Sequence, residues 1–152
     1  MLFDRSEILE TLRMLEIENL DVRTVTLGIN LLDCRSGDFS STIEKVAEKI
    51  RHLSLPFHEI VEETFIKYGI PVVNRRIAIS PVSFLLDGRE GKEEVVALAR
   101  RLDDLARELQ VDFIGGFSAL VPKGCTPGDL LLIDSLPLVL SQTQRMWGSV
   151  NL

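Results

Sequence analysis

The stretch Val111–Gly124, VDFIGGFSALVPKG, decides the fold class of this chain. Its composition predicts a strand from Asp112 to Val121 that runs into a Pro-Lys-Gly turn. An amphipathic helical pattern precedes it from Lys92 to Leu109, and another helix is expected after it from Asp129 to Thr143. A strand between two helices of this length is typical of parallel βαβ units, so the sequence predicts an α/β protein.

The same alternation of helix and strand covers the whole chain. Helical spacing is found near the N-terminus to about Glu18 and from Ser41 to Tyr68, where Pro56 is expected to interrupt the helix. Three further strands are predicted, at Val22–Asp33, Val72–Ser80 and Arg145–Leu152. We therefore expect the order α-β-α-β-α-β-α-β, a mainly parallel sheet, and a single α/β domain over residues 1–152.

The composition argues against several classes of partner. The chain has 152 residues, a net charge of −6 and no basic stripe, so we expect neither nucleic-acid nor membrane binding. It shows no apolar run of about 18 residues and no signal peptide. Cys34 and Cys125 form no metal-like pair, so we expect two free thiols in a reducing cytoplasm, no metal and no cofactor.

Each predicted strand has one apolar face and one face of small or polar residues. Strands of a parallel sheet covered on both faces are instead continuous apolar runs. Four strands are too few to close a parallel barrel, so the sheet is open or is completed from outside the chain. The second face is small because another layer packs tightly on it, or it lines a binding site. Its residues include Thr24, Thr26, Gly28, Asn30, Asn74, Arg76, Ala78, Ser80, Asp112, Gly116 and Ser118.

Candidate binding residues come from this second face and from the strand ends. Arg76 can hold a carboxylate or phosphate in its planar fork, or can pair with Asp112 or Asp33 and fix the sheet. The glycine pair at 115–116 allows a close approach or forms a β-bulge, and Cys34 faces a site or is an inert buried thiol. No catalytic set is assigned. The candidate set for a small anionic ligand is Asp33, Cys34, Asn74, Arg76, Asp112, Gly115, Gly116, Ser118 and Lys123.

Three motifs resemble one known family. They are LGINLLDC at Leu27–Cys34, GIPVVNRRIAISP at Gly69–Pro81, and the stretch quoted first. The chain looks like the N-terminal part of the uncharacterised microbial "PFL family protein", assigned to the pyruvate formate-lyase-like fold. The resemblance extends through LLIDSLP at Leu131–Pro137 and the terminal GSVNL.

The resemblance implies a ten-stranded α/β barrel built from two five-stranded parallel halves, but no established activity. Members are several hundred residues long and carry a cysteine near the position of Trp147. A glycyl-radical enzyme also needs an Arg-Val-x-Gly-Tyr-like segment, which this chain lacks, so we expect no radical chemistry of its own. Two hypotheses follow: a split half-barrel completed by a homo-oligomer or a complementary chain, and a binding protein or enzyme for a small anionic metabolite.

Overall fold

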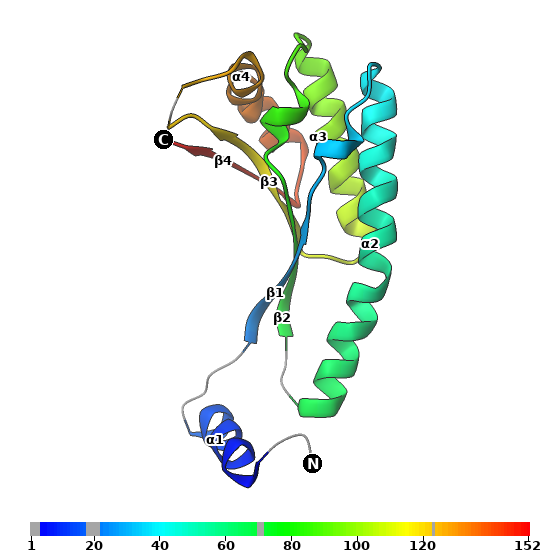
Figure 1. Cartoon of the computed structure of the whole chain (residues 1–152). Coiled ribbons are helices and arrows are strands. Elements are labelled where there is room, and N and C mark those ends of the chain that lie inside the picture. The colour runs from blue at the N-terminus through cyan, green and yellow to red at the C-terminus, as the bar shows by residue number, and fades with distance from the viewer. Residues whose placement is uncertain (1–3, 18–21, 70–71, 123) are drawn as a thin grey trace.

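The computed structural model describes residues 4–17, 22–69, 72–122 and 124–152. Four helices alternate with four strands, and short 3-10 turns follow the first two strands (Figure 1). The elements are α1 (Arg5–Glu16), β1 (Val22–Ile29), η1 (Leu32–Cys34), α2 (Phe39–Tyr68), β2 (Val72–Ile79), η2 (Val82–Leu85), α3 (Lys92–Glu108), β3 (Phe113–Leu120), α4 (Pro127–Gln142) and β4 (Met146–Asn151).

The strands form one sheet in the order β1-β2-β3-β4, and every neighbouring pair is parallel. The predicted α/β class with a parallel sheet is therefore confirmed. The register places Leu27 beside Ile77, Ile77 beside Ile114 and Ile114 beside Met146. This apolar row crosses all four strands and lies on the face that the helices cover.

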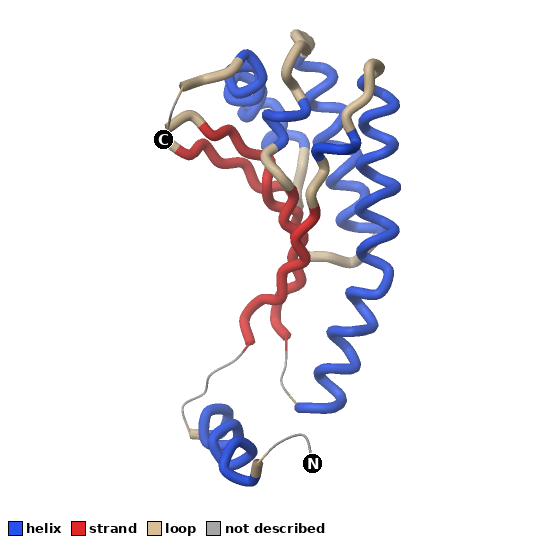
Figure 2. Tube along the Cα trace, viewed as in Figure 1, coloured by secondary structure: helices blue, strands red, loops and turns tan. Residues whose placement is uncertain are grey.

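The core lies between that face and a layer made of α2, α3 and α4. Figure 2 shows α2 and α3 together on one side of the twisted strands, and α4 packs against α3, β3 and β4. The buried apolar residues of α3 recur at helical spacing, so they form a continuous apolar stripe on the side of the helix that faces the core. Within the described ranges, no helix is both long and apolar enough to cross a membrane. The largest fully buried side chains include Leu31, Ile50, Ile77, Leu98, Leu102, Leu105, Ile114, Phe117 and Leu132.

The predicted break at Pro56 is wrong, because α2 continues through it as one helix. An internal proline costs about 3 kcal/mol. Beyond it, α2 buries Phe57 and Val61, and burial of each such side chain contributes about 1.5–3 kcal/mol. This gain offsets the lost hydrogen bond.

Two predicted element ends also differ. The first strand stops at Ile29 rather than Asp33, because Ser80 Oγ accepts the N–H of Leu31 at 3.0 Å and the chain then turns into η1. The helix expected to open at Ser41 is instead capped by Asp38, whose Oδ2 accepts the Ser41 N–H at 2.8 Å.

Asp103 links α3 to the start of β4. A charged residue of a surface helix is usually solvated, but the side chain of Asp103 is only 3% exposed. Its Oδ1 accepts the backbone N–H groups of Gln144 at 2.8 Å and Arg145 at 2.6 Å. Its Oδ2 accepts from Arg107 Nη2 at 2.5 Å. A buried carboxylate thus fixes the point at which the fourth strand enters the sheet.

We predict that Asp103→Ala lowers the free energy of unfolding by about 2–4 kcal/mol, because it leaves two buried N–H groups without an acceptor. Urea denaturation measures this loss. The control is Asp104→Ala, whose side chain is 66% exposed and meets Arg107 at 3.2 Å; this change should cost less than about 1 kcal/mol. Equal losses in the two variants would contradict the role given to Asp103.

Candidate functional site

The second face of the sheet is uncovered in the described chain. Thr26, Gly28, Asn30, Ala78 and the β4 residues of this face are exposed. The register aligns Gly28, Ala78 and Gly115 on adjacent strands, and Trp147 follows in the same row. The predicted division into an apolar and a small or polar face is therefore present on β1, β2 and β4, and in the described ranges the helices cover only the apolar side. On β3 the predicted face is wrong before the bulge: Phe113 and Gly115, rather than Asp112 and Gly116, share the open face with Arg76 and Ala78.

Three large side chains contact one another on this face. The guanidinium carbon of Arg76 lies 4.2 Å from the ring centroid of Phe113. The rings of Phe113 and Trp147 stack with centroids 5.0 Å apart and an interplanar angle of 23°. Because Arg76, Phe113 and Trp147 come from β2, β3 and β4, they form a ladder across three strands. Cation–π contact holds the guanidinium in place without neutralising its charge.

Arg76 has no carboxylate partner among the described residues, and its Nε is buried without an acceptor. Neither of the two expected pairings is made. Asp33 is engaged by Lys49, with its two carboxylate oxygens at 2.5 and 2.7 Å from Nζ. Asp112 Oδ2 accepts the backbone N–H of Arg75 at 2.7 Å. The positive charge of Arg76 is therefore available to a group outside the described chain.

The glycine pair on β3 has two separate roles. The β3–β4 register shifts between Gly115 and Phe117, so the predicted bulge is present. Gly116 has φ of +112°, and a Cβ there would lie 2.2 Å from the carbonyl oxygen of Ile79. The group that approaches Gly116 closely is thus the backbone carbonyl of Ile79, not a ligand. Gly115 lies on the open face, where a Cβ would meet nothing within 4 Å.

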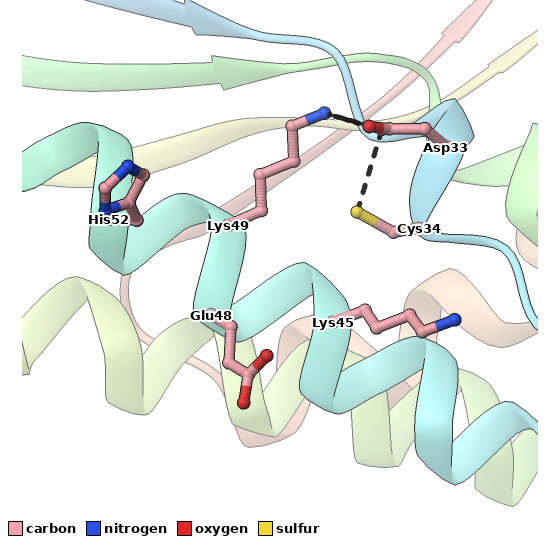
Figure 3. A pocket seen from close by; sticks show the side chains of 6 residues that line it. All are labelled: Asp33, Cys34, Lys45, Glu48, Lys49 and His52. Atoms are coloured by element: carbon pink, nitrogen blue, oxygen red, sulfur yellow. Dashed lines mark hydrogen bonds and ion pairs between the residues drawn. The ribbon is translucent and has the colours of Figure 1, made fainter.

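Asp33 and Cys34 lie away from the ladder, in a shallow pocket between η1 and α2 (Figure 3). The pocket has a volume of about 370 Å³ and is also lined by Lys45, Lys49 and His52. The hydrogen bond from Lys49 lowers the pKa of Asp33. Burial, together with the nearby Asp33 charge, raises the pKa of the Cys34 thiol. This residue is only 4% exposed, which favours the inert-thiol interpretation.

The remaining candidates are distributed along the strands. Asn74 lies on the open face beside Thr24, and Ser118 lies there beside Ser149. Lys123 falls outside the described residues. The structure thus brings Asn74, Arg76, Gly115 and Ser118 to one face, and it separates them from Asp33 and Cys34. Among the residues described, no group of three or more His, Cys, Asp or Glu side chains is arranged to hold a metal ion.

Sequence reasoning missed Phe113 and Trp147. The strand alternation places Phe113 on the same face as Arg76 only when the two strands are in register, and register is not encoded in a single strand. Trp147 was noted only as the position near which members of the resembling family carry a cysteine. Fold and site together define a parallel α/β protein. In the part of the chain that the structure describes, one face of its sheet is covered by helices, and the other is open and carries an arginine without a carboxylate partner.

Comparison with known proteins shows the family. Residues 13–152 match the family described as uncharacterised ACR (DUF711). A UPF0210 protein of Carboxydothermus hydrogenoformans is 47% identical over 150 residues, which cover 99% of this chain and 33% of that protein. A UPF0210 protein of Desulforudis audaxviator is 48% identical over 95% of this chain and 32% of its own length. A UPF0210 protein of Listeria monocytogenes is 43% identical over 97% of this chain and 33% of its own length.

The chain belongs to the uncharacterised DUF711 (UPF0210) family. It spans about a third of the length of these curated relatives. The expectation of an uncharacterised family of unknown function is confirmed. The matches show no link to a pyruvate formate-lyase-like protein, which stays a prediction.

We predict that Gly116→Ala lowers the free energy of unfolding by about 2–5 kcal/mol, because it adds a clash with Ile79 to a backbone conformation that alanine avoids. Chemical denaturation measures this. Gly115→Ala is the control and should change stability by less than about 1 kcal/mol, since its Cβ meets open space. Similar stabilities for the two variants would contradict the bulge geometry.

We predict that Cys125 reacts with an aromatic disulfide reagent on the order of tenfold or more faster than Cys34 at neutral pH. Cys125 is exposed, whereas Cys34 is buried and its raised pKa leaves less thiolate at neutral pH. Stopped-flow absorbance resolves the two phases, and Cys125→Ser should remove the fast one. A fast phase that persists in Cys125→Ser would show that Cys34 is open to reagents.

Proposed function

We propose that this chain is one unit of a larger α/β barrel-like assembly, completed by a second copy of the chain or by a complementary chain, and that the open face lines its interior. The observation that carries the proposal is the one-sided helix layer. Parallel sheets bury both faces in almost all known proteins, whereas here only one face is covered. The sequential strand order with all connecting helices on that face is the arrangement expected of a barrel segment.

Helix α1 supports the proposal independently. Asp4 and Glu7 form a capping box at its start, yet Ile8, Leu9 and Leu12 are 46%, 58% and 46% exposed. Figure 1 shows α1 apart from the other helices. A free helix of this length is only marginally stable in water, so its apolar stripe needs a packing partner. Further polypeptide that continues the sheet would supply one.

The motif resemblance agrees with this proposal. A pyruvate formate-lyase-like barrel consists of two parallel halves with helices outside, and four sequential parallel strands correspond to most of one half. No radical chemistry is proposed for the chain itself, because it lacks the radical-glycine segment. The greater length of the relatives provides enough polypeptide for the rest of such a barrel.

A second candidate function is the binding of a small anionic metabolite at the open face. The specific observation is the charge of Arg76, which has no carboxylate partner among the described residues. Asn74, two residues before Arg76 on β2, and Ser118 on β3 lie on the same face as this cation. This function is compatible with the assembly, because the interior of a barrel is a frequent place for a ligand.

The assembly is tested by size-exclusion chromatography with multi-angle light scattering. We predict a mass of at least two chains of 17.1 kDa at micromolar concentration. Leu9→Gln should raise the dissociation constant roughly tenfold, because it removes a leucine buried at the interface. Its control is Glu10→Gln, an exposed neighbour on α1, which should leave the mass unchanged. A monodisperse monomer would contradict completion by a second copy of the chain.

A further inference from the structure

Part of the open face, called the floor below, consists of Gly28, Ala78 and Gly115 and so has no side chain larger than a methyl group. Gly28, Ala78 and Gly115 are neighbours across three adjacent strands, so the floor extends over about 10 Å. A Cβ at Gly28 or Gly115 would have no atom within 4 Å. Glycine weakens a strand, and neither position needs it for reasons of internal space. No contact within the described chain therefore explains why glycine occupies these two positions.

The Arg76–Phe113–Trp147 ladder borders this floor. Trp147 lies in the same row as the floor residues, beside Gly115, while Arg76 and Phe113 occupy the preceding row of the same face. The indole is 61% exposed, and the guanidinium lies over the ring of Phe113. A molecule on the floor would thus touch aromatic surface and a fixed cation at the same time.

Charge selects the kind of molecule. Among the described strand residues on this face, Arg76 is the only ionisable one. Its Nε is buried and has no acceptor. A single planar guanidinium matches one carboxylate with two parallel hydrogen bonds. A phosphate ester carries a second negative charge, and the described strand residues of this face supply no second cation.

We propose that the face binds a planar carboxylate, an aromatic or conjugated acid. Its carboxylate bonds to Arg76, and its flat body lies on Gly28, Ala78 and Gly115 beside the ladder. The inference rests on the proposed function in one respect: further polypeptide encloses the face and keeps water from competing for the guanidinium. The site residues themselves all belong to this chain.

The test is a titration of the full chain with benzoate, followed by the fluorescence of Trp147, the only tryptophan in the sequence. Benzamide, which is neutral and of the same shape, is the comparison ligand. We expect saturable benzoate binding that is roughly tenfold tighter than benzamide binding, the difference that a charge-assisted pair supplies. Equal binding of the two, or no saturable benzoate binding, overturns the proposal.

Two variants test separately how the guanidinium of Arg76 and the small residues of the floor contribute to benzoate binding. Arg76→Gln should reduce benzoate affinity to that of benzamide, while Arg100→Gln removes the same charge from the exposed side of α3 and should change nothing. Gly28→Val places a β-branched side chain on the floor, at a position where a Cβ would meet no atom within 4 Å, so it should abolish binding and leave the melting temperature unchanged or higher. Retained benzoate binding in Arg76→Gln or in Gly28→Val overturns the proposal.

Light scattering on the same samples keeps the two proposals distinguishable. A monomer that binds benzoate through Arg76 would refute completion by a second copy of the chain and support the ligand site. An assembly of two or more chains that does not discriminate benzoate from benzamide would support the proposed function and overturn the ligand site.

Discussion

Burial of one face of a parallel sheet under α2, α3 and α4 is the interaction on which the rest of this structure depends. The row from Leu27 through Ile77 and Ile114 to Met146 gives the helices a continuous apolar surface. Because successive side chains of a strand point to opposite faces, the same register also determines which residues are neighbours on the open face. There it aligns glycine, alanine, glycine and tryptophan. The packing of the core and the form of the open face are thus consequences of one register.

The open face has two features that are unusual for a strand surface in contact with water. Beside its threonines and other polar residues, this face has two glycines, Gly28 and Gly115, whose missing side chains would meet only open space, although glycine weakens a strand. Its one cation is held by stacking on Phe113 rather than by an acid. Both features have a simple explanation if something outside the described chain occupies the face. The exposed leucines of α1 indicate the same at a second place.

Much of the fold could be predicted from the sequence because alternation is a local property. The helix and strand order, the αL cap at Gly69 and the bulge at Gly115–Gly116 all follow from short patterns. Predictions failed where distant groups decide the outcome. Helix α2 continues through Pro56 because of the residues that it buries further along. The burial of Asp103 likewise depends on distant groups, the backbone N–H groups of Gln144 and Arg145. The ladder of Arg76, Phe113 and Trp147 depends on the register of three strands, which no single strand encodes.

Enclosure of the open face is the central claim, and acrylamide quenching of Trp147 fluorescence in the full chain tests it most directly. In the described chain the indole is 61% exposed, so a free face predicts quenching close to that of a small tryptophan peptide. The account predicts instead a shielded indole, with a quenching constant several times lower that rises to the peptide value in denaturant. Quenching of the native chain at the peptide value would contradict the account.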